Sequence, residues 1–267
     1  MQPNQGDLPE FKNLIVQQDG PLSIVTLNRP QALNAVDTVM TGEIEQFVAW
    51  LAGHEEDVRV VIATGSEHAF CAGDDVKEVG TLDLEAATQL SLRQAQMYLQ
   101  FEKLGQPIIA AINGPALGAG CVFAFSCDFR IASHAATFGM PEIRLGWAPG
   151  YGVAQLTALV GKARALELCM TGKIISAQQA LAWGLINETV ALNSLMDRCR
   201  QIADELLAMP PIGLRETKRL IHADEGNRPK LTFAADTAAY IRCLDTADAR
   251  EGIEAFTQKR PAKFQGH

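Results

Sequence analysis

Hydrophobic and polar positions change their spacing repeatedly up to Gly150, and each change predicts a new element. Short runs of apolar, often β-branched residues predict strands, whereas apolar residues three or four positions apart predict helices. The predicted strands are Leu14–Val16, Leu22–Leu27, Val58–Thr64, Pro107–Ile112, Phe129–Ala132 and Thr137–Gly139. The predicted helices follow Asp37, span Leu82–Leu104 and begin near Leu117. Strands that alternate with helices indicate an α/β architecture with crossover connections.

Beyond Gly150 the pattern becomes helical almost throughout. Because no Pro/Ser-rich linker precedes this part, we expect it to extend one domain rather than to fold separately. We divide the chain into a core of residues 1–200 and a C-terminal helical region of residues 201–267 that packs on it. The predicted helices are Val153–Val160, Ala163–Thr171, Ala177–Trp183, Ser194–Ala208, Ile212–Ile221, Leu231–Leu244 and Asp248–Lys259.

Composition narrows the classes of protein to which this chain can belong. Of the 267 residues, 48% are hydrophobic and 20% are charged, which is ordinary for a globular protein and excludes a disordered chain. With 23 Lys and Arg against 31 Asp and Glu, the formal net charge is −8. A net negative chain without a basic run argues against nucleic-acid binding. A few placed cations would still suffice for a phosphorylated small ligand.

The cysteines and the apolar runs bear on metal binding and location. None of the six cysteines has CxxC spacing and no histidine cluster accompanies them, so we expect no metal site. Without a signal-peptide pattern, reduced thiols in the cytoplasm are the simplest interpretation. Leu104–Cys127 has no charged residue, but Asn-Gly-Pro at residues 113–115 breaks it. We therefore predict a buried strand, a turn and a buried helix there rather than a membrane span.

Two glycine-containing loops are candidates for chemistry performed by the backbone. His68–Lys77 follows a predicted strand, at the end where α/β proteins place ligands, and Gly73 would let the backbone approach a ligand closely. Asn113–Cys121 delivers a buried strand into a helix start, whose free N–H groups suit a developing oxyanion. From the residues alone, either loop could equally be a tight turn that serves packing.

Glu142 is the candidate acid or base. It follows a proline between a short predicted strand and an apolar loop, and burial beside Leu145 and Trp147 would raise its pKa toward the range useful for proton transfer. A solvated loop glutamate is the alternative. Trp147 and Tyr151 could line a pocket or pack in the core.

Taken together and in order, these segments resemble the crotonase superfamily, also called the enoyl-CoA hydratase/isomerase family. The resemblance covers nearly the whole chain, and it implies a spiral of ββα repeats with a C-terminal helical region that packs on neighbouring subunits as a homotrimer or dimer of trimers. It also implies an acyl-CoA thioester as substrate, with coenzyme A as part of that substrate and no separate cofactor, metal, nucleic acid or membrane partner. The matching motifs are Leu27–Pro30 with Ala32–Ala35, Phe70–Asp75, Asn113-Gly114 with Leu117–Gly120, Cys127-Asp128 and Phe256–Arg260.

The resemblance also assigns roles. The backbone N–H groups of Asp74 and Ala119 would hold the thioester oxygen as it becomes an enolate. We expect the Asp74 carboxylate to point away, because an anion facing an enolate would be repelled. The family's backbone contacts to the CoA adenine would fall on Ala32, Ala35, Ala72 and Asp74, and its phosphate contacts on Lys77 and on Lys259, the latter in its own or a neighbouring subunit.

The acid/base positions discriminate between reactions. Hydratases of this family use two glutamates; one matches Glu142, whereas the other falls on Val122, which cannot transfer a proton. One carboxylate can still move a proton along a substrate, so the resemblance favours an enoyl-CoA isomerase. The alternatives are an enoyl-CoA hydratase with a non-standard second acid/base, an acyl-CoA hydrolase or decarboxylase, and a weakly catalytic acyl-CoA-binding protein.

Overall fold

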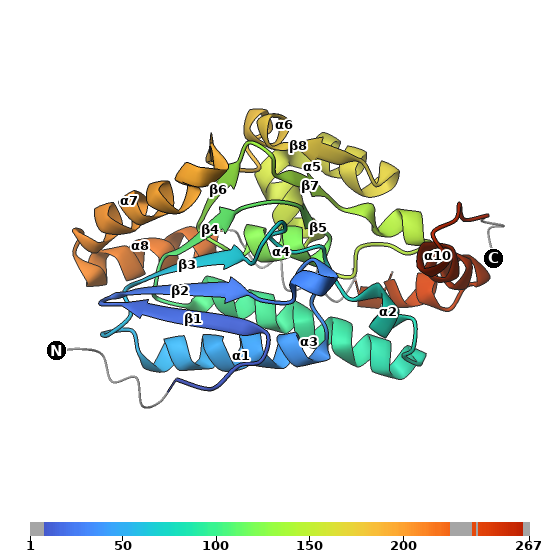
Figure 1. The fold of residues 1–267 in the computed structure, drawn as a ribbon, viewed down its shortest axis with the longest axis horizontal. Helices are drawn as coiled ribbons and strands as arrows, with labels where there is room; N and C mark the ends of the chain where they lie inside the picture. The colour runs from blue at the N-terminus through green and yellow to red at the C-terminus, as the bar shows by residue number, and fades with distance from the viewer. Residues whose placement is uncertain (1–7, 225–236, 239, 264–267) are drawn as a thin grey trace.

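Two β-sheets organise the chain in a computed structural model that describes residues 8–224, 237, 238 and 240–263 (Figure 1). The larger sheet has the order β1-β2-β3-β4-β6-β9, in which β1 and β2 are antiparallel and the other neighbours are parallel. Its strands are β1 (Leu14–Asp19), β2 (Leu22–Leu27), β3 (Val60–Gly65), β4 (Ile108–Ile112), β6 (Phe129–Ser133) and β9 (Glu188–Val190). The smaller sheet, in the order β5-β7-β8, comprises β5 (Ala116–Leu117), β7 (Thr137–Gly139) and β8 (Ile174–Ser176).

The middle strands β3 and β4 are almost entirely apolar because both faces of the larger sheet are covered. In β3, Val61 and Ala63 join the core with side chains of α1 (Thr38–Gly53) and α3 (Leu84–Lys103). Val60 and Ile62 face the opposite way, toward α7 (Leu195–Leu207). Successive side chains of a strand point to opposite faces, so a strand between two helical layers needs a continuous apolar run. The predicted α/β architecture is confirmed.

Most predicted elements are present, with bounds shifted by a few residues. The helices not yet introduced are α2 (Val76–Val79), α4 (Ala119–Phe125), α5 (Val153–Thr171), α6 (Ala177–Ala182), α8 (Pro211–Asp224), α10 (Ala247–Gln258) and the 3₁₀ helices Pro30–Ala32, Pro141–Leu145 and Leu192–Ser194. The two helices predicted between Val153 and Thr171 are continuous apart from a non-helical Gly161. Much of the predicted helix Leu231–Leu244 lies outside the described residues. The short strands β5, β8 and β9 were not predicted, because two or three residues carry no detectable alternation.

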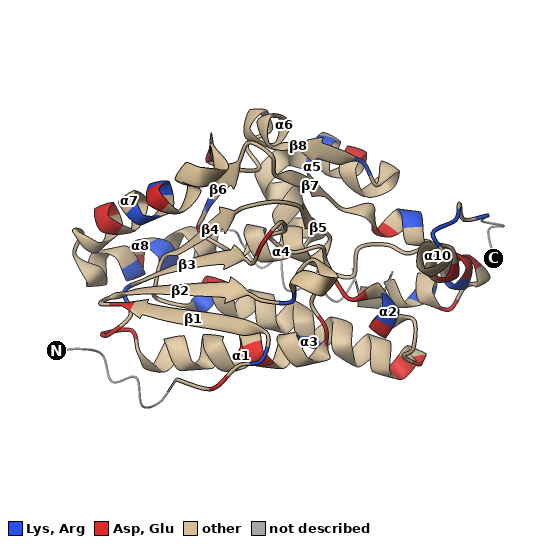
Figure 2. Cartoon of the chain, in the orientation of Figure 1, with Lys and Arg blue, Asp and Glu red and all other residues tan. Residues whose placement is uncertain are grey.

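Charge is distributed unevenly over this framework. Acidic and basic residues occur along helices such as α7 and α10, whereas α4 in the centre has none (Figure 2). Every residue of α4 is buried. Within the described part of the chain, no helix is long and apolar enough to cross a membrane. The described residues also contain no cluster of His, Cys, Asp or Glu side chains able to hold a metal ion.

Asp128 connects α8 to the larger sheet. Its carboxylate accepts hydrogen bonds from the Ile108 backbone N–H (2.7 Å) and from Lys218 Nζ (2.8 Å), and Nε2 of His222 lies 3.2 Å from it. Burial alone would raise the pKa of Asp128, but the contacts with His222 and Lys218 outweigh it and hold the pKa below its usual value. The proposed domain division at residue 200 falls inside α7, and α8 is tied to the core through Lys218.

Replacing Asp128 with alanine is expected to lower the free energy of unfolding by about 3–5 kcal/mol, since it leaves the Lys218 ammonium buried without a counter-charge. Urea denaturation at neutral pH measures the loss. The stabilisation by Asp128 is present above the ordinary aspartate pKa and is lost on acidification, so the two proteins should converge at low pH. Glu216→Gln, on the exposed Glu216–Arg219 pair of the same helix, should cost less than about 1 kcal/mol. Equal effects of the two substitutions would contradict the assignment.

Candidate active site

The first loop of the site is held against an earlier segment of the chain. Val36 N donates to Gly73 O (2.8 Å) and Asp75 N donates to Val36 O (3.0 Å), so the backbone at Asp74 runs parallel to that at Val36. Gly73 has φ 109°, a conformation that L-residues rarely adopt. The carboxylate of Asp75 caps α2 by accepting from the N–H groups of Lys77 and Glu78 and pairs with Arg29, so Asp75 stabilises the turn.

The second loop meets the first through glycine. A Cβ on Gly73 would lie 3.0 Å from Leu117 O and 3.7 Å from Ala119 N, so the two backbones approach where only glycine fits comfortably. Gly118 has φ 51° and leads directly into α4, of which Ala119 is the first residue. The N–H groups in the first turn of a helix have no partner within the helix. The Asp74 and Ala119 backbones therefore lie in adjacent turns, an arrangement suited to two hydrogen bonds to one oxyanion.

Glu142 lies beside these turns. It belongs to the 3₁₀ helix Pro141–Leu145, and its Oε1 is 3.0 Å from the position that a Cβ on Gly118 would occupy. Its Oε2 is buried and has no hydrogen-bond partner among the described residues. Burial, together with the nearby charge of Asp74, raises the pKa of Glu142 to about 8. A buried carboxyl group with a free oxygen and a pKa near neutrality is suited to general acid/base catalysis.

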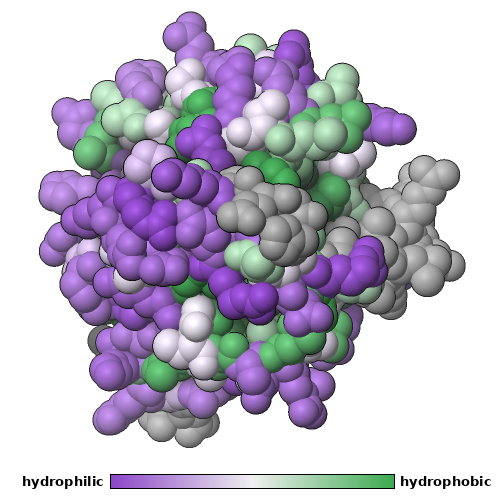
Figure 3. All heavy atoms as spheres, turned by 90° about the vertical axis from the view of Figure 1, so that its right-hand side faces the viewer, coloured by the Kyte–Doolittle hydropathy of each residue, from purple (hydrophilic) through white to green (hydrophobic). Residues whose placement is uncertain are grey.

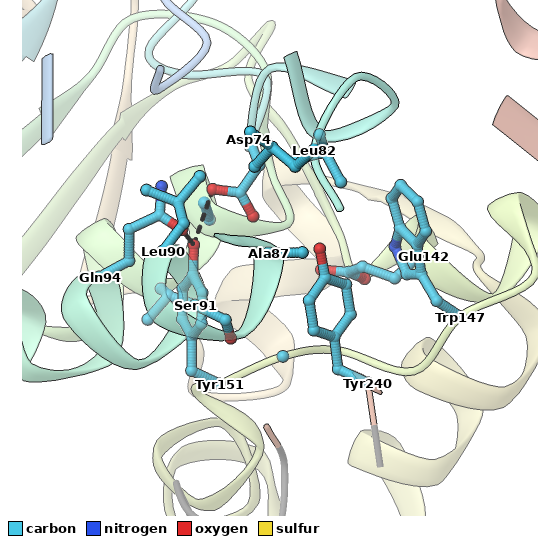
Figure 4. A pocket seen from close by; sticks show the side chains of 14 residues that line it. Asp74, Leu82, Ala87, Leu90, Ser91, Gln94, Glu142, Trp147, Tyr151 and Tyr240 are labelled. Carbon is cyan, nitrogen blue, oxygen red and sulfur yellow. Dashed lines mark hydrogen bonds between the residues drawn. The ribbon is translucent and has the colours of Figure 1, made fainter. Parts of the chain in front are cut away.

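The side chain of Asp74 corrects one prediction. Rather than pointing away from the site, its carboxylate lines the same pocket as Glu142 (Figure 4). Its Oδ1 accepts a 2.8 Å hydrogen bond from the Tyr151 hydroxyl, which also contacts Gln94 Oε1 at 3.3 Å. Burial raises the pKa of Asp74 to about 6, although the hydrogen bonds from Tyr151 and Gln94 oppose this rise. The predicted direction was wrong because these partners hold the Asp74 carboxylate in the pocket.

The pocket joins segments that are distant in the sequence. Trp147 and Tyr151 both line it. Val122, which occupies the position of the second glutamate of the family's hydratases, lines it as well. Residues of α3 supply one side and Tyr240 another (Figure 4). The other lining residues cannot be named from the sequence, because a pattern of packing positions does not show which of them border a cavity. They are Leu82, Ala87, Leu90, Ser91, Gln94 and Tyr240.

The candidate CoA contacts fall into two groups. Ala32, Ala35, Ala72 and Asp74 are brought together, since Ala72 N donates to Leu33 O (3.0 Å) and Val36 pairs with Asp74. Lys77 is exposed on α2, and the exposed Lys259 ends α10, which contacts α2. Both ammonium groups are thus available to a ligand, and their roles stay predictions.

Two buried thiols near the loops are poor nucleophiles. Burial raises the pKa of Cys71 to about 12, and it raises the pKa of Cys121 even further above its ordinary value. A thiolate is the reactive form of cysteine, so neither side chain is reactive near neutral pH. Glu142 and Asp74 are therefore the candidates for proton transfer in this pocket.

Comparison with known proteins agrees with this geometry. Residues 18–267 match the family model for enoyl-CoA hydratase/isomerase. The chain is 34% identical over 258 residues to a short-chain-enoyl-CoA hydratase of Clostridium acetobutylicum, covering 96% of this chain and 98% of the relative. It is equally identical, over 258 residues, to a crotonyl-CoA hydratase of Syntrophomonas wolfei, covering 95% of this chain and 98% of the relative.

Solved structures share the fold. The structure of an enoyl-CoA hydratase from Bacillus anthracis is similar with a TM-score of 0.78 at 33% identity, covering 96% of this chain and 100% of that chain. A methylmalonyl CoA decarboxylase is similar with a TM-score of 0.82 at 25% identity, covering 97% of this chain and 100% of that chain. The predicted crotonase fold is confirmed by these likenesses.

Proposed function

This chain belongs to the enoyl-CoA hydratase/isomerase family and is an acyl-CoA enzyme, and from that premise we propose that it moves the double bond of a 3-enoyl-CoA to the 2-position, with Glu142 as the proton carrier. One observation carries the proposal. Glu142 is the buried carboxyl group with a free oxygen beside the turn that presents Ala119, whereas position 122 holds a valine.

The proposed reaction needs one base and one oxyanion site. The Glu142 carboxylate takes a proton from C2, and the electron pair of the broken C–H bond delocalises onto the thioester oxygen. The backbone N–H groups of Asp74 and Ala119 hydrogen-bond that oxygen, a contribution that is about 3 kcal/mol per donor in a protease. Glu142 then returns the proton to C4, so the C3=C4 bond becomes C2=C3 and no atom is gained or lost.

The substrate's CoA portion would extend from the pocket to the two groups of candidate contacts. Backbone atoms of Ala32, Ala35, Ala72 and Asp74 would contact the adenine, which explains why small residues suffice there. Lys77 and Lys259 would supply the positive charge for the phosphates. These few cations reconcile a phosphorylated ligand with a net charge of −8.

Hydration of a 2-enoyl-CoA is the second candidate. Two observations favour it: similar proteins are named short-chain-enoyl-CoA and crotonyl-CoA hydratase, and the Asp74 carboxylate shares the pocket with Glu142. Hydrolysis or decarboxylation of a CoA thioester would use the same oxyanion site, and one similar structure is that of a methylmalonyl CoA decarboxylase.

A substrate panel tests the proposal. The purified protein is assayed with short 3-enoyl-CoA and 2-enoyl-CoA thioesters, with separate detection of the conjugated double bond, the 3-hydroxyacyl product, free thiol and carbon dioxide. Formation of 2-enoyl-CoA from 3-enoyl-CoA is expected. Release of thiol or carbon dioxide without isomerisation would replace the proposal with a hydrolase or a decarboxylase. Binding of CoA thioesters without any turnover would indicate a binding protein.

We also propose an oligomeric assembly and a cytoplasmic location. Exposed apolar side chains occur on α8 and α10 and on the segment between α7 and α8, among them Met209, Ile212, Leu220, Ile221 and Phe256. Hydrophobic surface also lies between hydrophilic areas on the face shown in Figure 3. Such surface fits a homotrimer or a dimer of trimers, which sedimentation would distinguish from a monomer. A cytoplasmic location agrees with the free thiols of all six cysteines.

A further inference from the structure

We propose that the side chain of Asp74, rather than that of position 122, is the second proton-transfer group of this site and takes a proton from water during hydration of a 2-enoyl-CoA. This inference rests on the proposed function for its oxyanion site and for Glu142. It extends that function because Asp74 then acts twice, with its backbone N–H on the thioester oxygen and with its carboxylate on water.

The placement of Asp74 supports this role. Its carboxylate lines the pocket together with Glu142, and the two groups are close enough for the charge of Asp74 to raise the pKa of Glu142. Oδ1 is engaged by the Tyr151 hydroxyl. The other oxygen is directed toward the side of the pocket that contains Tyr240 and Glu142 (Figure 4). Space of about 20 Å³ is free in the pocket, which is enough for one water molecule.

A network drawn from several elements fixes the carboxylate. Tyr151 precedes α5, and Gln94 on α3 is buried and in turn contacts Thr41 Oγ1 of α1 at 3.3 Å. The bridge to Val36 fixes the Asp74 backbone from the other side. Among the described residues, no cation pairs with Asp74, although burying a carboxylate without one is costly. A buried, perturbed carboxylate held in a pocket by several elements is typical of a functional group.

Different surroundings give the carboxyl groups of Asp74 and Glu142 different pKa values. At a pH between about 6 and about 8, Asp74 is ionised and Glu142 is protonated. That pair of states supplies a base and an acid together, the division of roles that hydration requires. The other titratable groups facing Asp74 are Asp75 and Glu78 near α2, Tyr98 of α3, and Cys71, Tyr151 and Tyr240.

The proposed step balances. The oxygen of water bonds to C3 while one of its protons passes to the Asp74 carboxylate. The π electrons of C2=C3 move onto the thioester oxygen, and the resulting enolate takes the proton of the Glu142 carboxyl group at C2. The product is a 3-hydroxyacyl-CoA. Asp74 then loses its proton to solvent and Glu142 regains one, which restores the starting states.

Asp74→Asn tests the proposal, because the asparagine keeps the backbone N–H and an oxygen that can accept from Tyr151. We expect hydration of crotonyl-CoA to fall at least about 100-fold while isomerisation falls much less, so that the ratio of the two rates changes by about tenfold or more. Asp83→Asn, which alters an exposed helix cap that asparagine satisfies equally well, is the matched control and should leave the ratio unchanged.

The pH profile gives a readout that a merely structural role would not move. Hydration should be bell-shaped with limbs near pH 6 and pH 8, whereas isomerisation should rise through the upper limb because it needs ionised Glu142. Tyr151→Phe removes a hydrogen bond that lowers the pKa of Asp74, so the acidic limb of hydration should move to higher pH. Asp74→Asn should move the isomerisation limb to lower pH, since the charge that raises the pKa of Glu142 is gone.

Each outcome decides between the two proposals. An unchanged ratio in Asp74→Asn, or no hydration by the wild-type protein, would overturn the role of the Asp74 side chain and leave isomerisation by Glu142 standing. Hydration without isomerisation by the wild-type protein would overturn the isomerase proposal. In that case the role of Asp74 is supported if Asp74→Asn abolishes the hydration and Tyr151→Phe shifts its acidic limb.

Discussion

Replacing Glu142 with glutamine is expected to lower the turnover of both 3-enoyl-CoA and 2-enoyl-CoA by about 100- to 10,000-fold. Glutamine has nearly the same shape as glutamate, but it can neither accept the C2 proton as a base nor donate one as an acid. The affinity for CoA should change little, because the candidate contacts for the adenine and the phosphates lie on other elements. Stopped-assay rates together with calorimetric CoA binding measure the two quantities.

The carboxyl group of Glu142 is buried, so the substitution also has an effect on folding that must be separated from catalysis. Removing an ionisable group from an apolar site should leave the free energy of unfolding unchanged or raise it. Glu167→Gln, on the outer side of α5 where the glutamate pairs with Arg164 and Lys173, is the matched control and should keep full activity. Retained turnover in Glu142→Gln, with folding intact, would remove Glu142 as the proton carrier.

Replacing Gly118 with alanine is expected to lower kcat at least about 100-fold, comparable to the loss of an oxyanion-hole donor. Gly118 has φ 51° and ψ −121°, a conformation that costs an L-residue about 1–3 kcal/mol. The added Cβ would also lie 3.0 Å from Glu142 Oε1, so either the carboxyl group or the turn that presents Ala119 must shift. One methyl group therefore disturbs the oxyanion site and the proton carrier together, and steady-state kinetics with a 3-enoyl-CoA measures the loss.

Gly53 provides the comparison for Gly118→Ala. It ends α1, its φ is not positive, and a Cβ there would have no neighbour within 4 Å. Gly53→Ala should leave kcat unchanged and alter stability by less than about 1 kcal/mol. If Gly118→Ala remained as active as Gly53→Ala, the adjacent turns at Gly73 and Gly118 would be packing features rather than an oxyanion site.

The sequence pointed to the two glycine-containing turns that the structure places together. Gly73 and Gly118 were found because conformations with positive φ and close backbone contacts leave a signature in residue type that needs no knowledge of neighbours. Glu142 stood out because it is a single carboxylate among apolar residues. The family resemblance supplied the reason to place these segments in one site, and the close approaches of Gly73 to Ala119 and of Gly118 to Glu142 agree with it.

The order of strands and helices was also predictable from the sequence. The apolar runs that form β3 and β4 mark strands covered on both faces, and their order with α1 and α3 indicates the parallel sheet. Register and the smaller sheet were not predictable, because β5 and β8 are too short for a pattern and are held by partners far along the chain. The helix content after Gly150 was clear, whereas its attachment through Lys218 and Asp128 required the structure.

By itself, then, the sequence singled out two glycine-containing turns and one lone carboxyl group in an apolar segment as candidates, since these are local properties. The family resemblance, not local pattern, assigned the N–H groups of Asp74 and Ala119 to the oxyanion. Only the tertiary structure decided the direction of the Asp74 side chain. That direction depends on Tyr151 and Gln94, which come from distant elements and pair with the carboxylate inside the pocket. From charge repulsion alone, the Asp74 carboxylate was predicted to point away from the site. Hydrogen bonds that form only in the folded chain instead hold it in the pocket that Glu142 also lines.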